Sequence, residues 1–219
     1  MEYRSFYAMT LAVLLTLVLA SCASPPAAPD SKRSAAPPIT VNSLVILPAT
    51  IPHDQTSKSK QKQATTGQLE AGREALDALL AEYGDGLNNV TMISEGELEG
   101  MLGDFSGGLQ SQARKVGAQA GGDAVLISTI KRFVDRDASE SRPASVAFEY
   151  QLVAVKSGQI LCAGVFDETQ QPLLSNIFSL RQAIRRKFKW ISAEELLREG
   201  VVDRLDSCSS LDRVRKKTL

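Results

Sequence analysis

The chain has 219 residues, of which 25 are Lys or Arg, 25 are Asp or Glu and one is His. This balance of charge excludes a general electrostatic attraction to nucleic acid or to an anionic surface, and the length suits one domain with a tether. Aromatic residues make up only 5% of the chain, so the core is expected to consist of Leu, Val, Ile and Ala.

The first residues of the chain have the parts of a secretory signal peptide. Arg4 supplies a positive charge, residues 8–20 form an apolar run, and small residues precede Cys22. The run is shorter than the roughly 20 residues that a membrane-spanning helix needs. The sequence Leu-Ala-Ser-Cys at 19–22 resembles the lipobox of bacterial lipoproteins, in which the cysteine thiol receives a diacylglyceryl group. We therefore predict a signal peptide at 1–21 and lipidation of Cys22; the alternative is a plain signal peptide with a cysteine at its cut site.

Lipidation would hold the protein at a membrane. Each buried CH₂ group contributes about 0.8 kcal/mol, so detachment of two or three acyl chains is negligible. In the enterobacterial sorting rule, an Asp after the lipidated cysteine retains a lipoprotein at the inner membrane, whereas this chain has Ala23. The expected location is therefore the outer membrane, with the protein lipid-anchored on its periplasmic face.

Residues 22–42 are predicted to be a tether that precedes the globular part. The segment is rich in Ala, Pro and Ser, and its prolines keep it extended: Pro25, Pro26, Pro29, Pro37 and Pro38. At about 3.1 Å per residue in polyproline geometry, it would reach roughly 50 Å. A single globular domain is expected at 43–207, before a basic tail at 208–219, of which residues 213–217 are expected to be frayed.

The first half of the domain is predicted to alternate strands and helices. The apolar run at 43–48 indicates a central strand that is covered on both faces. Apolar residues at helical spacing predict a helix over 66–83, and a second strand follows at 89–93. Ser94 and Glu97 have the spacing of a capping box, which predicts a short helix that ends near residue 103.

The second half begins with a helix predicted at about 109–120 and a third strand at 123–134. Residues 145–155 alternate in polarity, which indicates a half-buried strand with Val146, Phe148, Tyr150 and Leu152 on one face. Ser157-Gly158 is a hairpin turn signal, and the chain returns at 159–166 as the partner strand. The third to fifth strands are therefore expected to form an antiparallel meander.

Helices are predicted to close the domain. One runs from Pro172 to about residue 188, and the last begins at a second capping box, Ser192 with Glu195, and is continued by residues 201–205. The order of elements predicts an α/β fold of the mixed α+β kind, with about five strands in a mixed sheet and helices packed on it.

Three cysteines are present, and Cys22 is assigned to lipidation. Cys162 lies in a predicted strand and Cys208 lies near the end of the last helix, in a compartment where disulfides persist. Two alternatives stay open: a bridge that ties the helix to the sheet, or two independent buried thiols.

The residues indicate neither a metal site nor a cofactor. His53 is the single histidine and lies in a Lys-rich loop, where it is expected to be solvated. No Cys-x-x-Cys spacing or His/Cys cluster occurs, and Gly121-Gly122 precedes a strand rather than following one, unlike a phosphate-binding loop.

Carboxylates gather at the predicted ends of the antiparallel strands: Asp135, Asp137, Glu140, Asp167 and Glu168. Paired carboxylates are the groups that hydrolyse glycosides. No aromatic residues flank them to stack on sugar rings, so solvated loop charges are the favoured interpretation.

The densest charge feature is a basic run that ends at Trp190: Arg181, Arg185, Arg186, Lys187 and Lys189. It could contact lipid phosphates, an acidic partner or the carboxylates of peptidoglycan. The favoured interpretation is a solvated helix face with cations near the helix C-terminus, where the helix dipole stabilises them.

Several stretches together resemble a group of envelope lipoproteins: the lipobox, the tether, SLVILP, GGDAVLIS and the hairpin SVAFEYQLVAVKSGQILCAGVFDETQQ. The group includes the curli-secretion lipoprotein, the lipoprotein activators of peptidoglycan synthases and the amino-terminal domain of the Tol-system β-propeller protein. The resemblance covers about residues 43–207 and implies a non-enzymatic role, with an envelope protein or a second copy as partner. The alternatives are an enzyme that acts on cell-wall glycans and a subunit of an oligomeric secretion pore.

Overall fold

The computed structural model describes residues 39–52, 65–136, 143–170 and 191–216. They belong to a unit that spans Ile39–Leu219. The predicted signal peptide, Cys22, Ala23 and the prolines of the predicted tether lie outside the described residues. His53, Asp137, Glu140 and the segment 171–190, with its predicted helix and basic residues, also lie outside them.

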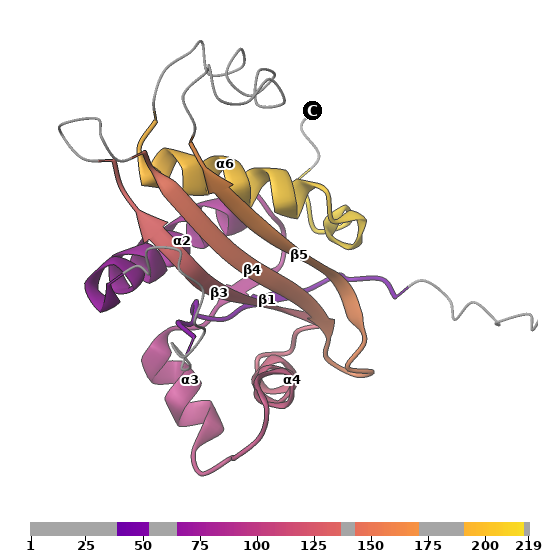
Figure 1. The fold of residues 1–219 in the computed structure, drawn as a ribbon. Coiled ribbons are helices and arrows are strands. Elements are labelled where there is room, and N and C mark those ends of the chain that lie inside the picture. The colour runs from indigo at the N-terminus through magenta and orange to yellow at the C-terminus, as the bar shows by residue number, and fades with distance from the viewer. Residues whose placement is uncertain (1–38, 53–64, 137–142, 171–190, 217–219) are drawn as a thin grey trace, which may run out of the picture. The chain divides into compact units, whose positions relative to one another are not determined.

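Five strands form one mixed sheet: β1 (Leu44–Ile46), β2 (Val90–Met92), β3 (Ala124–Val134), β4 (Ser145–Ala154) and β5 (Ile160–Thr169). Their order across the sheet is β2-β1-β3-β4-β5. β1 pairs in parallel with both β2 and β3, whereas β3, β4 and β5 form an antiparallel meander (Figure 1). The prediction of a five-stranded mixed sheet with an antiparallel C-terminal meander is confirmed.

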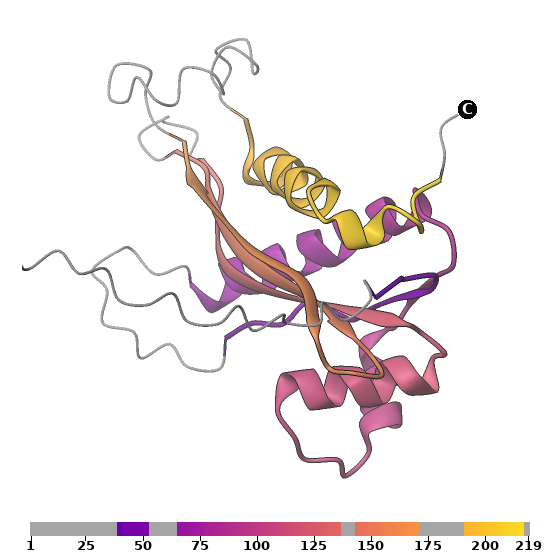
Figure 2. The same ribbon diagram turned by 90° about the vertical axis from the view of Figure 1, so that its right-hand side faces the viewer.

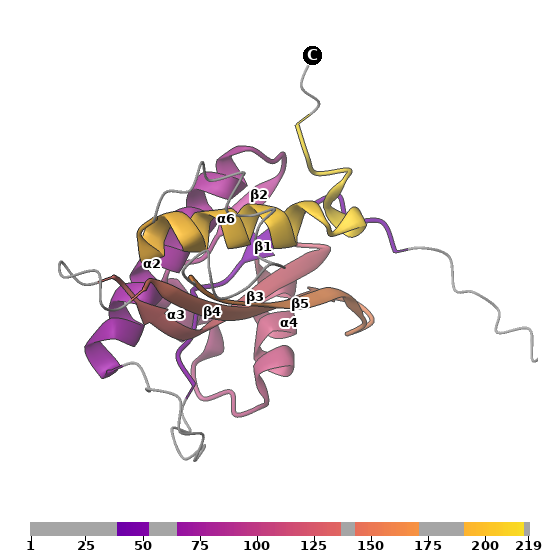
Figure 3. The ribbon, with the colours of Figure 1, turned by 45° about the horizontal axis from the view of Figure 1, so that its top comes forward.

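Helices cover both faces of this sheet: α2 (Thr66–Asp85), α3 (Glu95–Leu102), α4 (Leu109–Gln119) and α6 (Ala193–Asp206). α2 and α6 lie on one face, and α3 and α4 lie on the other (Figure 2). When the top of the molecule is turned toward the viewer, α6 lies beside α2 on the same face of the sheet (Figure 3). The sheet is therefore the middle layer of three.

Two hydrophobic clusters fill the spaces between the layers. Leu44 and Ile46 of β1 belong to the cluster under α2 and α6, and Val45 belongs to the cluster under α3 and α4. The expected central strand, covered on both faces, is confirmed. The first cluster also contains Val41, so the packed core reaches back into the segment that was assigned to the tether.

β4 is more deeply buried than its alternating sequence predicts. Phe148 and Leu152 face the cluster under α2 and α6, as expected. Val153, on the opposite face, is also fully buried, because it packs in the cluster under α3 and α4. Glu149, further along that second face, forms an ion pair with Lys131 of β3. This face of β4 is therefore partly exposed only in its middle, at Glu149 and Gln151, and is buried at Val153 and again at Ala147.

Each of the three helices that pack directly on the sheet approaches it at a glycine. A Cβ added to Gly72 of α2 would lie 2.4 Å from the Cβ of Phe133, and one added to Gly117 of α4 would lie 2.2 Å from a methyl of Val125. At Gly200 of α6, the added Cβ would lie 2.8 Å from the ring of Phe166. Because glycine has no side chain, each of these positions lets its helix lie closer to the sheet than any other residue type would.

The predicted start signals of two helices are confirmed. Ser94 with Glu97 and Ser192 with Glu195 both form complete capping boxes, in which the side chain of each residue accepts a hydrogen bond from the backbone amide of the other. A third box, Thr65 with Gln68, begins α2 and was not predicted.

The expectation of a frayed C-terminal tail is wrong for residues 213–216. Leu211 and Val214 are both buried in the cluster under α2 and α6. The amide of Asn88 donates to the carbonyl of Val214 at 2.5 Å, and Leu87 forms a β-bridge with Arg215. Leu211 and Val214 stand among basic residues in the sequence, so their apolar pattern was missed. They are three positions apart, and both side chains lie in the core.

Candidate functional site

A groove runs along the outer surface where α2 and α6 meet. Its narrow part lies between the two helices and has a volume of about 80 Å³, whereas its wide, open part, of about 590 Å³, is lined among the described residues by α6 alone. Both parts include Arg198 and Val202, so they form one feature, which we call the α2–α6 groove. Its lining residues are Leu79, Glu82, Tyr83, Arg198, Glu199, Val201, Val202, Asp203 and Asp206.

The floor of the groove is apolar. Leu79 and Val201 are almost fully buried beneath it, whereas Val202 is 45% exposed. Val202 is one of the few large aliphatic side chains among the described residues that remain this accessible. The groove therefore offers one apolar contact point on a helix surface that is otherwise polar.

Interactions between the two helices hold the walls of the groove. Arg198 of α6 forms an ion pair with Glu82 of α2, and this hydrogen bond lowers the pKa of the Glu82 carboxyl. The hydroxyl of Tyr83 donates to Asp206 at 3.0 Å. Burial disfavours the phenolate and raises the pKa of Tyr83 to about 12. Tyr83 is therefore a neutral hydrogen-bond donor at physiological pH.

The helices on either side of the groove are strongly acidic. α2 carries five carboxylates and one arginine, and α6 carries five carboxylates and two arginines. The pair thus has seven more negative than positive charges, although the whole chain is balanced. The charge of this layer is a property of the fold that the overall composition conceals.

One arginine anchors α2 to the neighbouring elements. Arg73 contacts Glu70, Asp77 and, at 2.6 Å, Glu95 at the start of α3. Asp77 also accepts the amide of Ala49 at 2.7 Å. Burial raises the pKa of the Asp77 carboxyl, while the Ala49 amide and Arg73 act in the opposite direction. These contacts fix α2 against the chain that follows β1.

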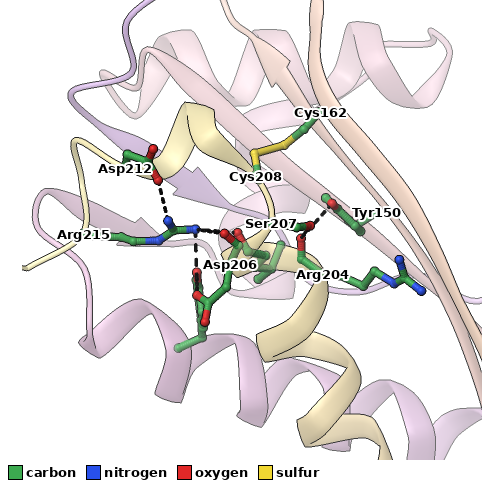
Figure 4. The surroundings of a disulfide bond; sticks show 10 residues. Tyr150, Cys162, Arg204, Asp206, Ser207, Cys208, Asp212 and Arg215 are labelled. Atoms are coloured by element: carbon green, nitrogen blue, oxygen red, sulfur yellow. Dashed lines mark hydrogen bonds and ion pairs between the residues drawn. A yellow bond between two sulfur atoms is a disulfide. The ribbon is translucent and has the colours of Figure 1, made fainter. Parts of the chain in front are cut away.

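A cluster of bonds, which we call the C-terminal clamp, fixes the end of α6 (Figure 4). Cys162 of β5 and Cys208 form a disulfide with their Cα atoms 6.0 Å apart. The hydroxyl of Tyr150 donates to the carbonyl of Arg204 at 3.0 Å. Arg215 donates to the last-turn carbonyls of Leu205 and Asp206, each at 2.8 Å. The clamp therefore joins α6 to β4, β5 and the C-terminal residues.

Three of the five carboxylates considered for glycan hydrolysis lie among the described residues, and each of the three has another interaction partner. Asp135 accepts the amide of Ala193 at 3.0 Å, which places it at the N-terminus of α6. Asp167 forms an ion pair with Arg132. Glu168 also has an interaction partner. Asp135 therefore contributes to a helix start, where the helix dipole stabilises a negative charge.

Within the described ranges, no group of three or more His, Cys, Asp and Glu residues is arranged to hold a metal ion. No helix in the same ranges is long and apolar enough to cross a membrane. The groove was not predicted from the sequence, because its two walls are more than a hundred residues apart.

No protein-family model matches the chain, and no curated protein matches it. Among solved structures, the chain is similar to the LpoB C-terminal domain from Escherichia coli, with 20% identity, 62% of this chain and 88% of that chain covered, and a TM-score of 0.38. It is similar to the PelC dodecamer from Paraburkholderia phytofirmans, with 13% identity, 78% and 91% covered, and a TM-score of 0.40. It is also similar to lipoprotein GNA1162 from Neisseria meningitidis, with 15% identity, 66% and 92% covered, and a TM-score of 0.37. At these scores we draw no functional conclusion from the similarities.

Proposed function

We propose that this chain is a lipoprotein of the bacterial envelope, anchored by acyl chains on Cys22 to the outer membrane and facing the periplasm, where it acts as a non-enzymatic docking or assembly factor. The sequence Leu-Ala-Ser-Cys at 19–22 supports the anchor. The observation that carries the docking role is the α2–α6 groove, a shaped surface with an exposed apolar side chain, Val202, on rigidly held helices.

The tether gives this arrangement a physical advantage. A domain held at a membrane has a high effective concentration for partners at the same membrane, so weak docking is sufficient. The extended tether of roughly 50 Å lets the domain search a shell around its anchor rather than one point.

The anchor is tested by replacing the lipidated residue. We expect Cys22→Ala to remain uncleaved or to become soluble, because neither the acyl chains nor the matching cleavage site would be present. Cell fractionation and mass spectrometry of the processed N-terminus measure this. A wild-type N-terminus without acyl chains, or a Cys22→Ala protein that is mature-sized and equally membrane-bound, would refute the anchor.

The docking role is tested with a photo-crosslinking amino acid incorporated in cells. We expect position 202, in the groove, to give a discrete crosslinked product with an envelope protein. Position 99 on α3, which is also exposed, serves as the matched control. Absence of discrete products from both positions and from a wider set of surface positions would contradict a docking function.

A further inference from the structure

Building on the proposed docking function, we propose that the α2–α6 groove binds a basic, amphipathic segment of a partner protein, with an aliphatic side chain of that segment over Val202. The inference depends on three features of the groove: its exposed apolar contact, the arrangement of its charges and its rigidity.

The accessible residues of the groove form a stripe along α6. Glu199 and Asp203 are four residues apart, as are Val202 and Asp206, so all four lie on one side of the helix. From Arg198 to Asp206 the stripe extends about 12 Å at 1.5 Å per residue. A partner helix of similar length that lies along α6 would place one apolar residue over Val202 and cations beside the carboxylates.

The charge of the groove selects the partner. Arg198 is the arginine that lines the groove, and it is engaged by Glu82 and, at 3.8 Å, by Glu194. Glu199, Asp203 and Asp206 are the other charged residues that line it. Asp203 lies 3.8 Å from Arg204 and Asp206 lies 3.8 Å from Arg215, so carboxylates outnumber guanidinium groups here but do not stand alone. This negative surface repels phosphates, which argues against anionic lipid or nucleic acid, and it attracts Lys and Arg.

The groove is held in place before a partner arrives. Arg198 and Glu82 join the helices, and Tyr83 binds Asp206 beside the groove. Gly200 lets α6 lie directly on the ring of Phe166, and the C-terminal clamp fixes the last turn. A rigid surface loses little conformational entropy on binding, which favours recognition by a short segment.

The probe for this inference is a short synthetic peptide of Leu and Lys, patterned as an amphipathic helix. We expect the oxidised wild-type domain to bind it in fluorescence anisotropy at physiological salt, and Glu199→Lys/Asp203→Lys to bind about tenfold more weakly. Val202→Ser should weaken binding without a change in charge. A peptide in which Glu replaces every Lys should not bind.

The matched control is Glu99→Lys/Asp104→Lys, which changes the net charge by the same amount on the other side of the sheet. It should bind the Leu and Lys peptide with at least half the affinity of the wild type. Circular dichroism and thermal melting establish that every variant is folded. Equal weakening by the two double variants would overturn the inference, because it would show attraction by net charge alone.

Failure of this inference differs from failure of the proposed function. If the groove is not the docking surface, discrete crosslinks in cells persist in Glu199→Lys/Asp203→Lys, and the docking function stands. If the docking function itself is wrong, no surface position gives a discrete crosslink, although the wild-type domain still binds the peptide in the groove-dependent manner described above.

Discussion

Tyr83 shows how partial burial in this fold changes the chemistry of a single residue. Its hydroxyl donates to Asp206, and burial raises its pKa to about 12. The ordinary tyrosine pKa is 10.0, so the folded state favours the neutral phenol. The folded state gains stability from this difference in the pKa of Tyr83, and the gain is fully present below pH 10. It is lost as the pH rises toward 12, because Tyr83 releases its phenolic proton at a lower pH in the unfolded chain than in the folded one.

A spectroscopic titration tests this assignment. The chain from Cys22 onward contains only Tyr83 and Tyr150, so the tyrosinate absorbance has two contributions. We expect a step near pH 12 in the wild type that is absent from Tyr83→Phe. If the two proteins differ by a step near pH 10 instead, burial does not control the phenol in the way that the structure indicates.

The packing of α4 on the sheet requires that Gly117 has no side chain. An added Cβ would lie 2.2 Å from Val125 and 2.7 Å from Val155, both of which are stiff at χ1. We expect Gly117→Ala to lower the free energy of unfolding by about 1–3 kcal/mol, as measured by urea denaturation.

Gly100 provides the control for Gly117. It lies in α3 with no atom within 4 Å of an added Cβ. Gly100→Ala should leave stability unchanged or raise it by up to about 1 kcal/mol, because Ala is the better helix former. Equal effects at the two positions would mean that α4 does not approach the sheet as closely as described.

At the scale of the element, α6 is defined by its two ends. Its N-terminus has a capping box and the carboxylate of Asp135, and its C-terminus is held by the C-terminal clamp. Both ends are therefore attached to the sheet through residues from other elements. This double attachment keeps the α2–α6 groove in one shape.

Breaking the disulfide should release one of these ends. Cys162 and Cys208 enclose a separation of 46 residues, for which the loop-entropy estimate gives about 4 kcal/mol. We expect Cys162→Ser/Cys208→Ser to lose about 2–5 kcal/mol in denaturant unfolding. Reductant should lower the stability of the wild type to a similar extent and leave the double variant unchanged; a response of the double variant would contradict the assignment.

Local sequence signals were sufficient for most elements but not for their contacts. The capping boxes at Ser94 and Ser192 and the alternation of β4 act between neighbours in the chain, so they predicted the helix starts and strand faces. The α2–α6 groove depends on how two distant helices pack, which no local pattern encodes. The buried tail residues Leu211 and Val214 were missed because their apolar signal is short and lies among charges.

At the scale of the whole molecule, the C-terminal residues complete the fold. Leu211 and Val214 are fully buried, and residues 214–216 bond to the chain that follows α2. A chain that ends at Ser209 would therefore lose two core side chains and part of the clamp, whereas a chain that ends at Lys216 keeps both.

Two truncations test this role. We expect the chain that ends at Lys216 to melt within a few degrees of the full chain, and the chain that ends at Ser209 to lose several kcal/mol or to fail to fold, because removing one large buried aliphatic side chain costs about 2–5 kcal/mol. Thermal melting and protease resistance measure the difference. Equal behaviour of the two truncations would show that the C-terminal residues are dispensable.

The position of β1 has a mechanical consequence. This first strand of the sheet, which follows the predicted tether, lies inside the sheet, with the amide of Leu44 bonded to Asn89 on one side and that of Leu47 to Leu126 on the other. A force that pulls on the N-terminus would have to break the hydrogen bonds of β1 to β2 and to β3 at the same time, instead of peeling an edge strand from one neighbour. Movement of a membrane would exert such a force on a chain that is anchored to it. If the proposed tether transmits tension to the domain, β1 is therefore the place where the domain resists it.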